Sequence, residues 1–139
     1  MRTADVDAAL AAARALLADA PDFADAWAYL GNTLVTRKRR FADGLAALER
    51  AVELEPTSPW FAYTLGWCRE YAANALARPK GGRAWQAEQP ATQDADTLYA
   101  TARAAFLRAL TLDPNDALRG DIEDMLDVVE NVTGVPWRE

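Results

Sequence analysis

Apolar and polar positions alternate along most of the chain in long stretches dominated by alanine, leucine, arginine and glutamate, with prolines between them. This composition predicts a series of helices. Proline cannot continue a helix but is favoured just after one stops, so Pro21, Pro56 and Pro114 mark helix ends. Side chains that can cap the next helix follow these prolines: Asp22, Thr57, Ser58, Asn115 and Asp116.

The spacing of two Leu-Gly pairs indicates an internal repeat. Leu30-Gly31 follows Pro21 by nine and ten residues, and Leu65-Gly66 follows Pro56 by the same interval. The two prolines are 35 residues apart, close to the period of a helical hairpin repeat. A two-helix unit cannot bury both of its faces alone, so we expect such units to stack and share one core.

At these positions the chain resembles the tetratricopeptide repeat family, whose units are pairs of antiparallel helices. The better-matching unit is residues 24–58, although Leu34 stands where the family has tyrosine and the turn RKRRF is one residue longer. The family's typical residues in this unit stand at Trp27, Leu30, Gly31, Gly44, Leu48, Ala51 and Pro56.

A second unit, residues 59–116, carries the same pattern with an interruption. Arg69 occupies its tyrosine position, and a segment at 78–94 with two prolines and a Gly-Gly pair predicts a loop insertion between its two helices. The matching positions before and after the insertion are Ala62, Leu65 and Gly66, then Ala102, Phe106, Ala109 and Pro114.

The resemblance implies a single all-α domain over residues 1–139, a right-handed superhelix of antiparallel helix pairs with about six helices. Residues 3–19 would form a helix without a partner, with Ala9, Ala13 and Leu16 facing the core. Residues 116–133 would form a capping helix. Its apolar residues are Leu118, Ile122, Met125, Leu126 and Val129, and its outer face is Gly120, Glu123, Asp124 and Asp127.

Four aromatic side chains form a stripe on one side of the helix that begins the second unit. At about 100° per residue, they lie within about 80° of one another. This stripe points away from the side that should contact the unit's own second helix, which is the side of Leu65 and Gly66. The four residues of the stripe are Trp60, Tyr63, Trp67 and Tyr71.

In the family, the side of the first helix opposite its partner lines a concave surface that holds peptides or partner helices. The resemblance therefore implies an adaptor or scaffold that binds a protein or peptide through the stripe, helped by Tyr29 and Asn32. Some family members clamp a carboxylate with lysine and asparagine, but Ala28 replaces the first lysine and Tyr63 and Trp67 replace polar clamp residues. A hydrophobic segment is therefore the favoured ligand.

Two other interpretations of the stripe remain open. The chain itself could cover the rings, with Trp85 of the insertion or Trp137 of the tail packed on them. Alternatively, exposed rings and the helix at 3–19 could be buried in a homodimer, which would make the protein a self-associating structural protein.

Basic residues gather in the two turns that connect the helices of each unit. Positive charge there complements the C-terminal dipoles of the preceding helices and needs no ligand. The alternative is an edge that contacts an anion or a nucleic acid. The residues are Arg37, Lys38, Arg39 and Arg40 in the first turn and Arg78, Lys80 and Arg83 in the second.

Composition narrows the function further. The chain has 139 residues, a net charge of −6 and a pI near 4.7, which weighs against a nucleic-acid partner. It has no histidine, one cysteine and one serine, so no nucleophile–base pair can be assembled. We therefore expect no enzyme, no metal and no cofactor. The N-terminus lacks a signal-peptide core and no apolar run could span a membrane, so we expect a cytoplasmic protein.

Overall fold

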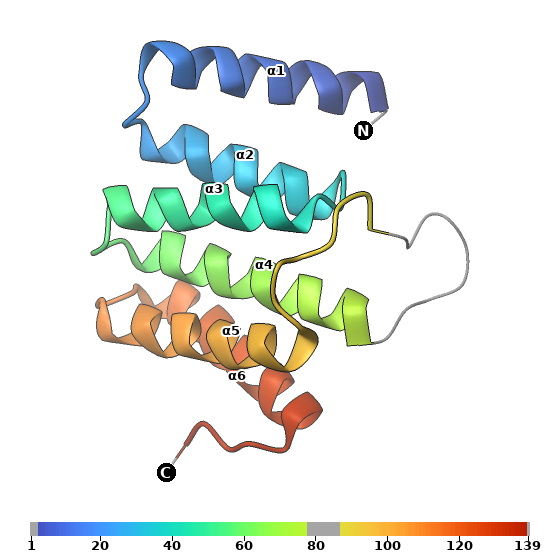
Figure 1. The fold of residues 1–139 in the computed structure, drawn as a ribbon. Helices are drawn as coiled ribbons and strands as arrows, with labels where there is room; N and C mark the ends of the chain where they lie inside the picture. Colours follow the sequence, from blue (N-terminus) through green and yellow to red (C-terminus); the bar gives the residue numbers. More distant parts are fainter. Residues whose placement is uncertain (1–2, 78–86, 139) are drawn as a thin grey trace.

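The computed structural model describes residues 3–77 and 87–138, and within these ranges the protein is all-helical, as predicted (Figure 1). No strand forms in the described ranges, and one isolated bridge joins Arg40 to Gln89. None of the described helices has both the length and the apolar character needed to cross a bilayer. The six helices are α1 (Thr3–Asp19), α2 (Ala24–Thr36), α3 (Phe41–Leu54), α4 (Pro59–Ala77), α5 (Ala95–Thr111) and α6 (Asp116–Thr133).

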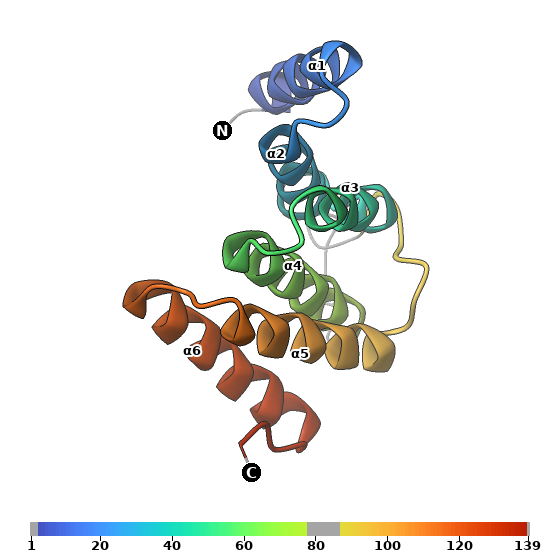
Figure 2. The same cartoon turned by 90° about the vertical axis from the view of Figure 1, so that its left-hand side faces the viewer.

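The helices pack in chain order into a stack. The most extensive contacts join α2 to α3 and α4 to α5, and smaller ones join α1 to α2, α3 to α4 and α5 to α6. Contacts also join α2 to α4 and α4 to α6, so alternate helices share a side of the stack. Figure 2 shows α2, α4 and the start of α6 toward one side, with α3 and α5 toward the other.

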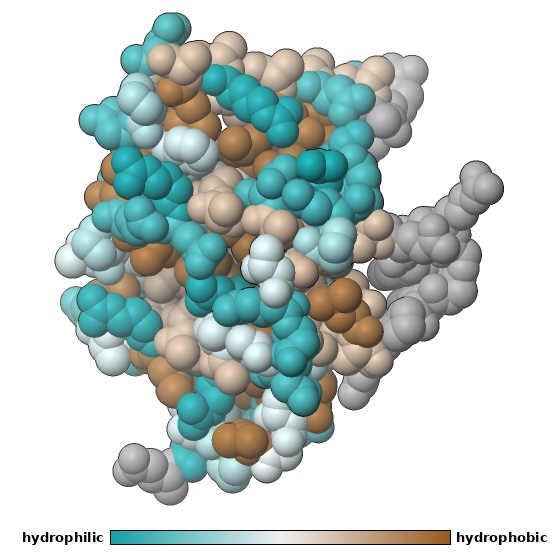
Figure 3. Space-filling view, viewed as in Figure 1, coloured by the Kyte–Doolittle hydropathy of each residue, from teal (hydrophilic) through white to brown (hydrophobic). Residues whose placement is uncertain are grey.

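The face formed by α3 and α5 mixes polar and hydrophobic residues without one dominant patch (Figure 3). Such a surface needs no partner to cover it, because single apolar side chains are common on protein surfaces. The opposite face, where α2 and α4 lie side by side, carries the aromatic stripe.

Glycines let the paired helices approach closely. A Cβ atom added to Gly31 would lie 2.6 Å from the carbonyl oxygen of Gly44 on α3, and one added to Gly66 would lie 2.8 Å from the ring of Phe106 on α5. Both distances are shorter than side-chain carbons tolerate. The two Leu-Gly pairs of the sequence therefore mark the closest approach within each helix pair.

The buried face of α1 differs from the one predicted. Leu16 is 44% exposed, so its predicted core position is wrong, and Ala9 is only half-buried; of the three predicted residues, Ala13 alone is buried. The helix is rotated by about one position because branched and longer side chains bury more apolar area than alanine does. The residues of α1 that pack on α2 are Val6, Leu10, Ala13 and Leu17.

The residue just before the helix caps α4, α5 and α6 with its side chain. Asn115 Oδ1 accepts a hydrogen bond from the N–H of Leu118 at 2.8 Å, and Ser58 Oγ accepts one from the N–H of Phe61 at 3.2 Å. Asp94, which the sequence reading missed, caps α5. Asp22 does not cap α2, because Phe23 occupies that N-cap position without a side-chain hydrogen bond.

The described end of the insertion, residues 87–94, runs back to the start of α3. The carbonyl oxygen of Gln89 accepts from the N–H of Phe41 at 3.0 Å, and its Oε1 accepts from the N–H of Asp43 at 2.9 Å. Glu88 adds an ion pair to Arg40 at 3.3 Å. Because the first N–H groups of a helix lack partners within the helix, Gln89 acts as a cap supplied from a distant part of the chain.

Replacing Gln89 with alanine should therefore destabilise α3. Loss of a side-chain cap costs about 0.5–2 kcal/mol, and we expect a value near the lower end because the carbonyl of residue 89 keeps its bond to Phe41. Chemical denaturation of the two variants Gln89→Ala and Gln93→Ala measures the effect. Equal stability of the two variants would contradict the capping role.

The C-terminal tail folds onto α6. Trp137 Nε1 donates to Asp127 at 2.8 Å, and the Trp137 N–H donates to Glu130 at 3.0 Å. The Arg138 guanidinium lies 4.0 Å from the centre of the Trp137 ring. Trp137 therefore packs on α6 and does not cover the aromatic stripe on α4, as one interpretation of the sequence had it.

Candidate functional site

A groove between α2 and α4 gathers the aromatic stripe and three residues from the end of α2. Its volume is about 410 Å³. We call it the aromatic groove. It is lined by Asn32, Thr36, Arg37, Trp60, Tyr63, Thr64, Trp67 and Tyr71.

The rings of the stripe are partly open to solvent. Trp60 is 55% exposed, whereas Tyr63, Trp67 and Tyr71 are half-buried. Of the two tryptophans considered as covers, Trp137 packs on α6 and Trp85 lies outside the described residues. The four rings thus present contact area at the surface while their inner edges pack on the core.

Contacts among the rings hold them in place. Trp67 stacks on Tyr71 with centroids 5.6 Å apart, and Trp60 lies 5.8 Å from Tyr63. Tyr71 also meets the buried ring of Phe41 edge-on at 6.3 Å, and Tyr63 lies 5.9 Å from the ring of buried Phe106. The spacings are those of favourable aromatic pairs, so the groove wall is organised without a ligand.

Beneath the rings, a hydrogen bond joins α4 to α2. Cys68 Sγ donates to Asn32 Oδ1 at 3.7 Å. Burial raises the pKa of the Cys68 thiol to about 12, so it stays protonated at neutral pH and serves as a donor. This contact joins the two helices and engages the Asn32 amide oxygen beside the groove.

The two threonine hydroxyls of the groove are already engaged as donors. Thr64 Oγ1 donates to the Trp60 carbonyl and Thr36 Oγ1 donates to the Asn32 carbonyl, each at 2.8 Å. The charged group in the lining is Arg37. A ligand would therefore meet a mostly aromatic wall whose polar features, among the described residues, are an amide, one guanidinium and the hydroxyls of Tyr63 and Tyr71.

Tyr29 does not line the aromatic groove. It is 47% exposed and lies in a separate groove of about 460 Å³ between α1 and α2, together with Leu16 and Phe23. Conversely, Arg37 was assigned to a basic edge, and the structure places it in the aromatic groove. The sequence could have indicated this position for Arg37. The 35-residue repeat aligns Tyr71 of the stripe with the last residue of α2, which directly precedes Arg37.

The basic edge of the first turn is largely neutralised by the chain's own acids. Lys38 Nζ lies 3.0 Å from Asp7, and Arg40 lies 2.9 Å from Asp43. The hydrogen bond to Asp43 is the main reason that the pKa of Arg40 is raised, and the same bond lowers the pKa of Asp43. The other basic residues predicted for this edge, Arg78, Lys80 and Arg83, lie outside the described residues.

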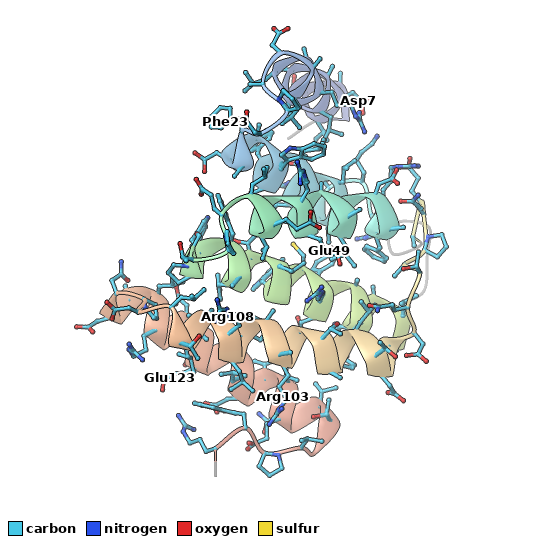
Figure 4. All side chains as sticks on the ribbon, turned by 60° about the vertical axis from the view of Figure 1, so that its left-hand side comes forward. Asp7, Phe23, Glu49, Arg103, Arg108 and Glu123 are labelled. Carbon is cyan, nitrogen blue, oxygen red and sulfur yellow. The ribbon has the colours of Figure 1, made fainter. Side chains whose placement is uncertain are left out.

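A larger cavity of about 660 Å³ lies between α5 and α6, but its lining has fewer aromatic side chains than the aromatic groove. Its walls are mostly alanine and valine, with Asp96 and Arg103 as charged groups. The Arg103 guanidinium donates to the Pro136 carbonyl at 3.2 Å, so it holds the tail in place (Figure 4). The aromatic groove is the better candidate because its large rings and its polar groups converge.

Comparisons of the chain with protein-family models, with curated proteins and with solved structures each found no match. The helical stack and the groove it forms are therefore the features from which a function can be proposed.

Proposed function

We propose that this protein is a tetratricopeptide-like adaptor that binds a segment of a partner protein in the aromatic groove. The observation that carries the proposal is that the exposed ring of Trp60 and the half-buried rings of Tyr63, Trp67 and Tyr71 line one groove, beside the Asn32 amide. Tryptophan and tyrosine offer large contact area at small entropic cost and are enriched at binding hot spots.

The length of the stripe suits an extended peptide. Trp60 and Tyr71 are eleven residues apart on one helix, and at about 1.5 Å per residue this corresponds to about 16 Å. An extended segment of about five residues covers that distance at about 3.3 Å each. Backbone groups of such a segment could bond the Asn32 amide, while its apolar side chains contact the rings.

Catalysis is a weaker interpretation of the same groove. The nearby thiol of Cys68 is buried and protonated, and the two threonine hydroxyls donate within their own helices. Activation of a nucleophile needs a neighbouring base or a lowered pKa, and the raised pKa of Cys68 acts in the opposite direction.

Self-association is the second candidate, and its best support lies outside the aromatic groove. Leu16, Phe23 and Tyr29 are 44%, 42% and 47% exposed and line the separate groove between α1 and α2. A second copy that covered them would bury a continuous apolar surface. Sedimentation at micromolar concentration distinguishes a dimer from a monomer, and a Tyr29→Glu variant should then dissociate any dimer formed there.

The variant Trp60→Ala separates binding from folding. Because Trp60 is 55% exposed, we expect a small change in stability but at least a tenfold loss of affinity, which corresponds to about 1.4 kcal/mol. Ligands would be octapeptides selected from a phage-displayed library by the full chain, with affinities measured by calorimetry.

The matched control is Phe23→Ala, since Phe23 is also an exposed ring but lies at the turn between α1 and α2 (Figure 4). It should leave peptide affinity unchanged. A library that yields no peptide, or a Trp60→Ala variant that binds as tightly as the parent, would refute the proposed function.

A further inference from the structure

The aromatic groove has a positive end. Arg37 follows α2 directly and lines the groove, and the Asn32–Cys68 contact places α2 and α4 in register. The two helices run in the same direction (Figure 1), and Arg37 lies five residues after Asn32. It therefore lies beside the part of α4 five residues after Cys68, which is the turn that follows Tyr71. The contact between Tyr71 and Phe41 at the start of α3 supports the same placement. A guanidinium therefore lies at the Tyr71 end of the stripe.

The half of the stripe that begins at Trp60 lies on the helix that packs against α6, and Asp121 lies on the side of α6 that packs there. Leu118 and Met125 of α6 pack on the same cluster as Tyr63 and Trp67. Asp121 lies three residues after Leu118 and four before Met125, so it shares their side of the helix. The pKa of Tyr63 is raised by burial and then by the charges of Asp121 and Asp124, which agrees with this placement.

The charges at the two ends lack ion-pair partners in the described part of the chain, whereas their neighbours have them. Lys38 and Arg40, beside Arg37, pair with Asp7 and with Asp43. On α6, the tail residue Arg138 lies 3.3 Å from Asp127 and 4.0 Å from Glu123. No such pair involves Arg37, Asp121 or Asp124 within residues 3–77 and 87–138. Near the two ends of the stripe, Arg37 and Asp121 are thus charges without an ion pair among the described residues.

The separation between the ends keeps the two charges distinct. The stripe is about 16 Å long, and exposed charges at physiological ionic strength are screened beyond about 8 Å. Each end can therefore select a ligand charge independently of the other. A ligand bound in one direction would satisfy both, and the reverse direction would place like charges together.

On the basis of the proposed function, we propose that the groove's occupant is an extended partner segment with a carboxylate at the Arg37 end and a lysine or arginine at the Trp60 end. The residues between the two charges are apolar, and the charges are about five residues apart. The cationic side chain lies against the exposed face of Trp60 and toward Asp121, where the ring and the carboxylate both attract it. The carboxylate comes from an acidic side chain or from the end of the partner chain.

The test uses the octapeptide library with the full chain and two charge-reversed variants. Peptides enriched by the parent should carry an acidic and a basic residue in a fixed order about five residues apart. Arg37→Glu should exchange the acidic residue for a basic one and leave the other end unchanged. The double variant Asp121→Lys, Asp124→Lys should exchange the basic residue for an acidic one and leave the Arg37 end unchanged. Each variant is therefore a control for the other.

Individual peptides give the quantitative result. Changing the acidic residue of an enriched peptide to its amide should weaken binding to the parent about fivefold to tenfold and should not weaken binding to Arg37→Glu. Arg108→Glu makes the same charge change on α5, about 200° around the helix from Phe106, and should behave as the parent (Figure 4). Synthetic peptides with free or amidated C-termini distinguish the two sources of the carboxylate.

The outcomes separate this inference from the proposed function. Enrichment of apolar peptides without a charge order, or an unchanged order with Arg37→Glu, would overturn the inference and leave peptide binding intact. Failure to enrich any peptide would remove both. Circular dichroism of each variant checks that it is folded, and the reciprocal switch of charge preference is a gain that an unfolded protein cannot show.

Discussion

Replacing Gly31 with alanine is expected to lower the free energy of unfolding by about 2 kcal/mol, within the usual range for overpacked cores. The added Cβ would lie 2.6 Å from the Gly44 carbonyl oxygen and 2.9 Å from the Leu48 backbone nitrogen. These are main-chain atoms of α3, so they cannot rotate away as a flexible side chain would. The two helices must separate instead, and the contacts on either side of the glycine weaken.

Gly120→Ala is the matched control, because it is the same change inside another helix. No atom lies within 4 Å of a Cβ placed on Gly120. Alanine should stabilise α6 there by about 0.5–1 kcal/mol, since glycine loses more backbone entropy on folding. Urea denaturation measures both variants, and the two shifts should have opposite signs. A stabilising Gly31→Ala would contradict the close approach of α2 and α3.

The Phe106→Ala variant should lose about 3–5 kcal/mol, the usual cost of removing a fully buried ring. Phe106 is completely buried, contacts Gly66 of α4 and lies 5.9 Å from Tyr63. Its removal leaves a cavity between α4 and α5 at the base of the stripe. Binding should weaken as well, because Tyr63 loses the ring that supports it.

Amide hydrogen exchange can show which helices of the Phe106→Ala variant lose stability. Helices of a linear stack contact mainly their neighbours, so α5 and α6 should lose protection more than α1 and α2. Val128→Ala on α6 is the control: Val128 is 40% exposed, and its truncation should change stability by less than about 0.5 kcal/mol. Uniform loss of protection across all helices would show that the stack unfolds as one unit.

Local patterns in the sequence were sufficient for the helices and for the direction of the stripe. The bounds at 3–19 and 116–133 coincide with α1 and α6, because prolines and capping residues act on their immediate neighbours. The direction of the rings followed from helical geometry applied to four large residues. An error of one residue would have rotated the stripe by about 100° without breaking it up.

Other features depended on contacts that no local pattern encodes. In alanine-rich α1 several faces are similarly apolar, so the packed face was misplaced and Leu16 proved exposed. Tyr29 was assigned to the wrong groove, because one step from Ala28 carries a side chain to another side of α2. The tail's return to α6 depends on Trp137 meeting Asp127, a pairing between segments that the sequence leaves unspecified.

The return of residues 88 and 89 to α3 also affects how the whole stack can deform. Arrays of helix pairs can change their curvature, because each pair contacts only the next pair. Here the segment that leads into α5 is fastened to the start of α3 through Phe41, Asp43 and Arg40. A change in curvature between the two pairs would have to break those bonds, so residues 88 and 89 stiffen the array between its two pairs. A partner that required the two pairs to bend apart would have to break these bonds, which would weaken its binding.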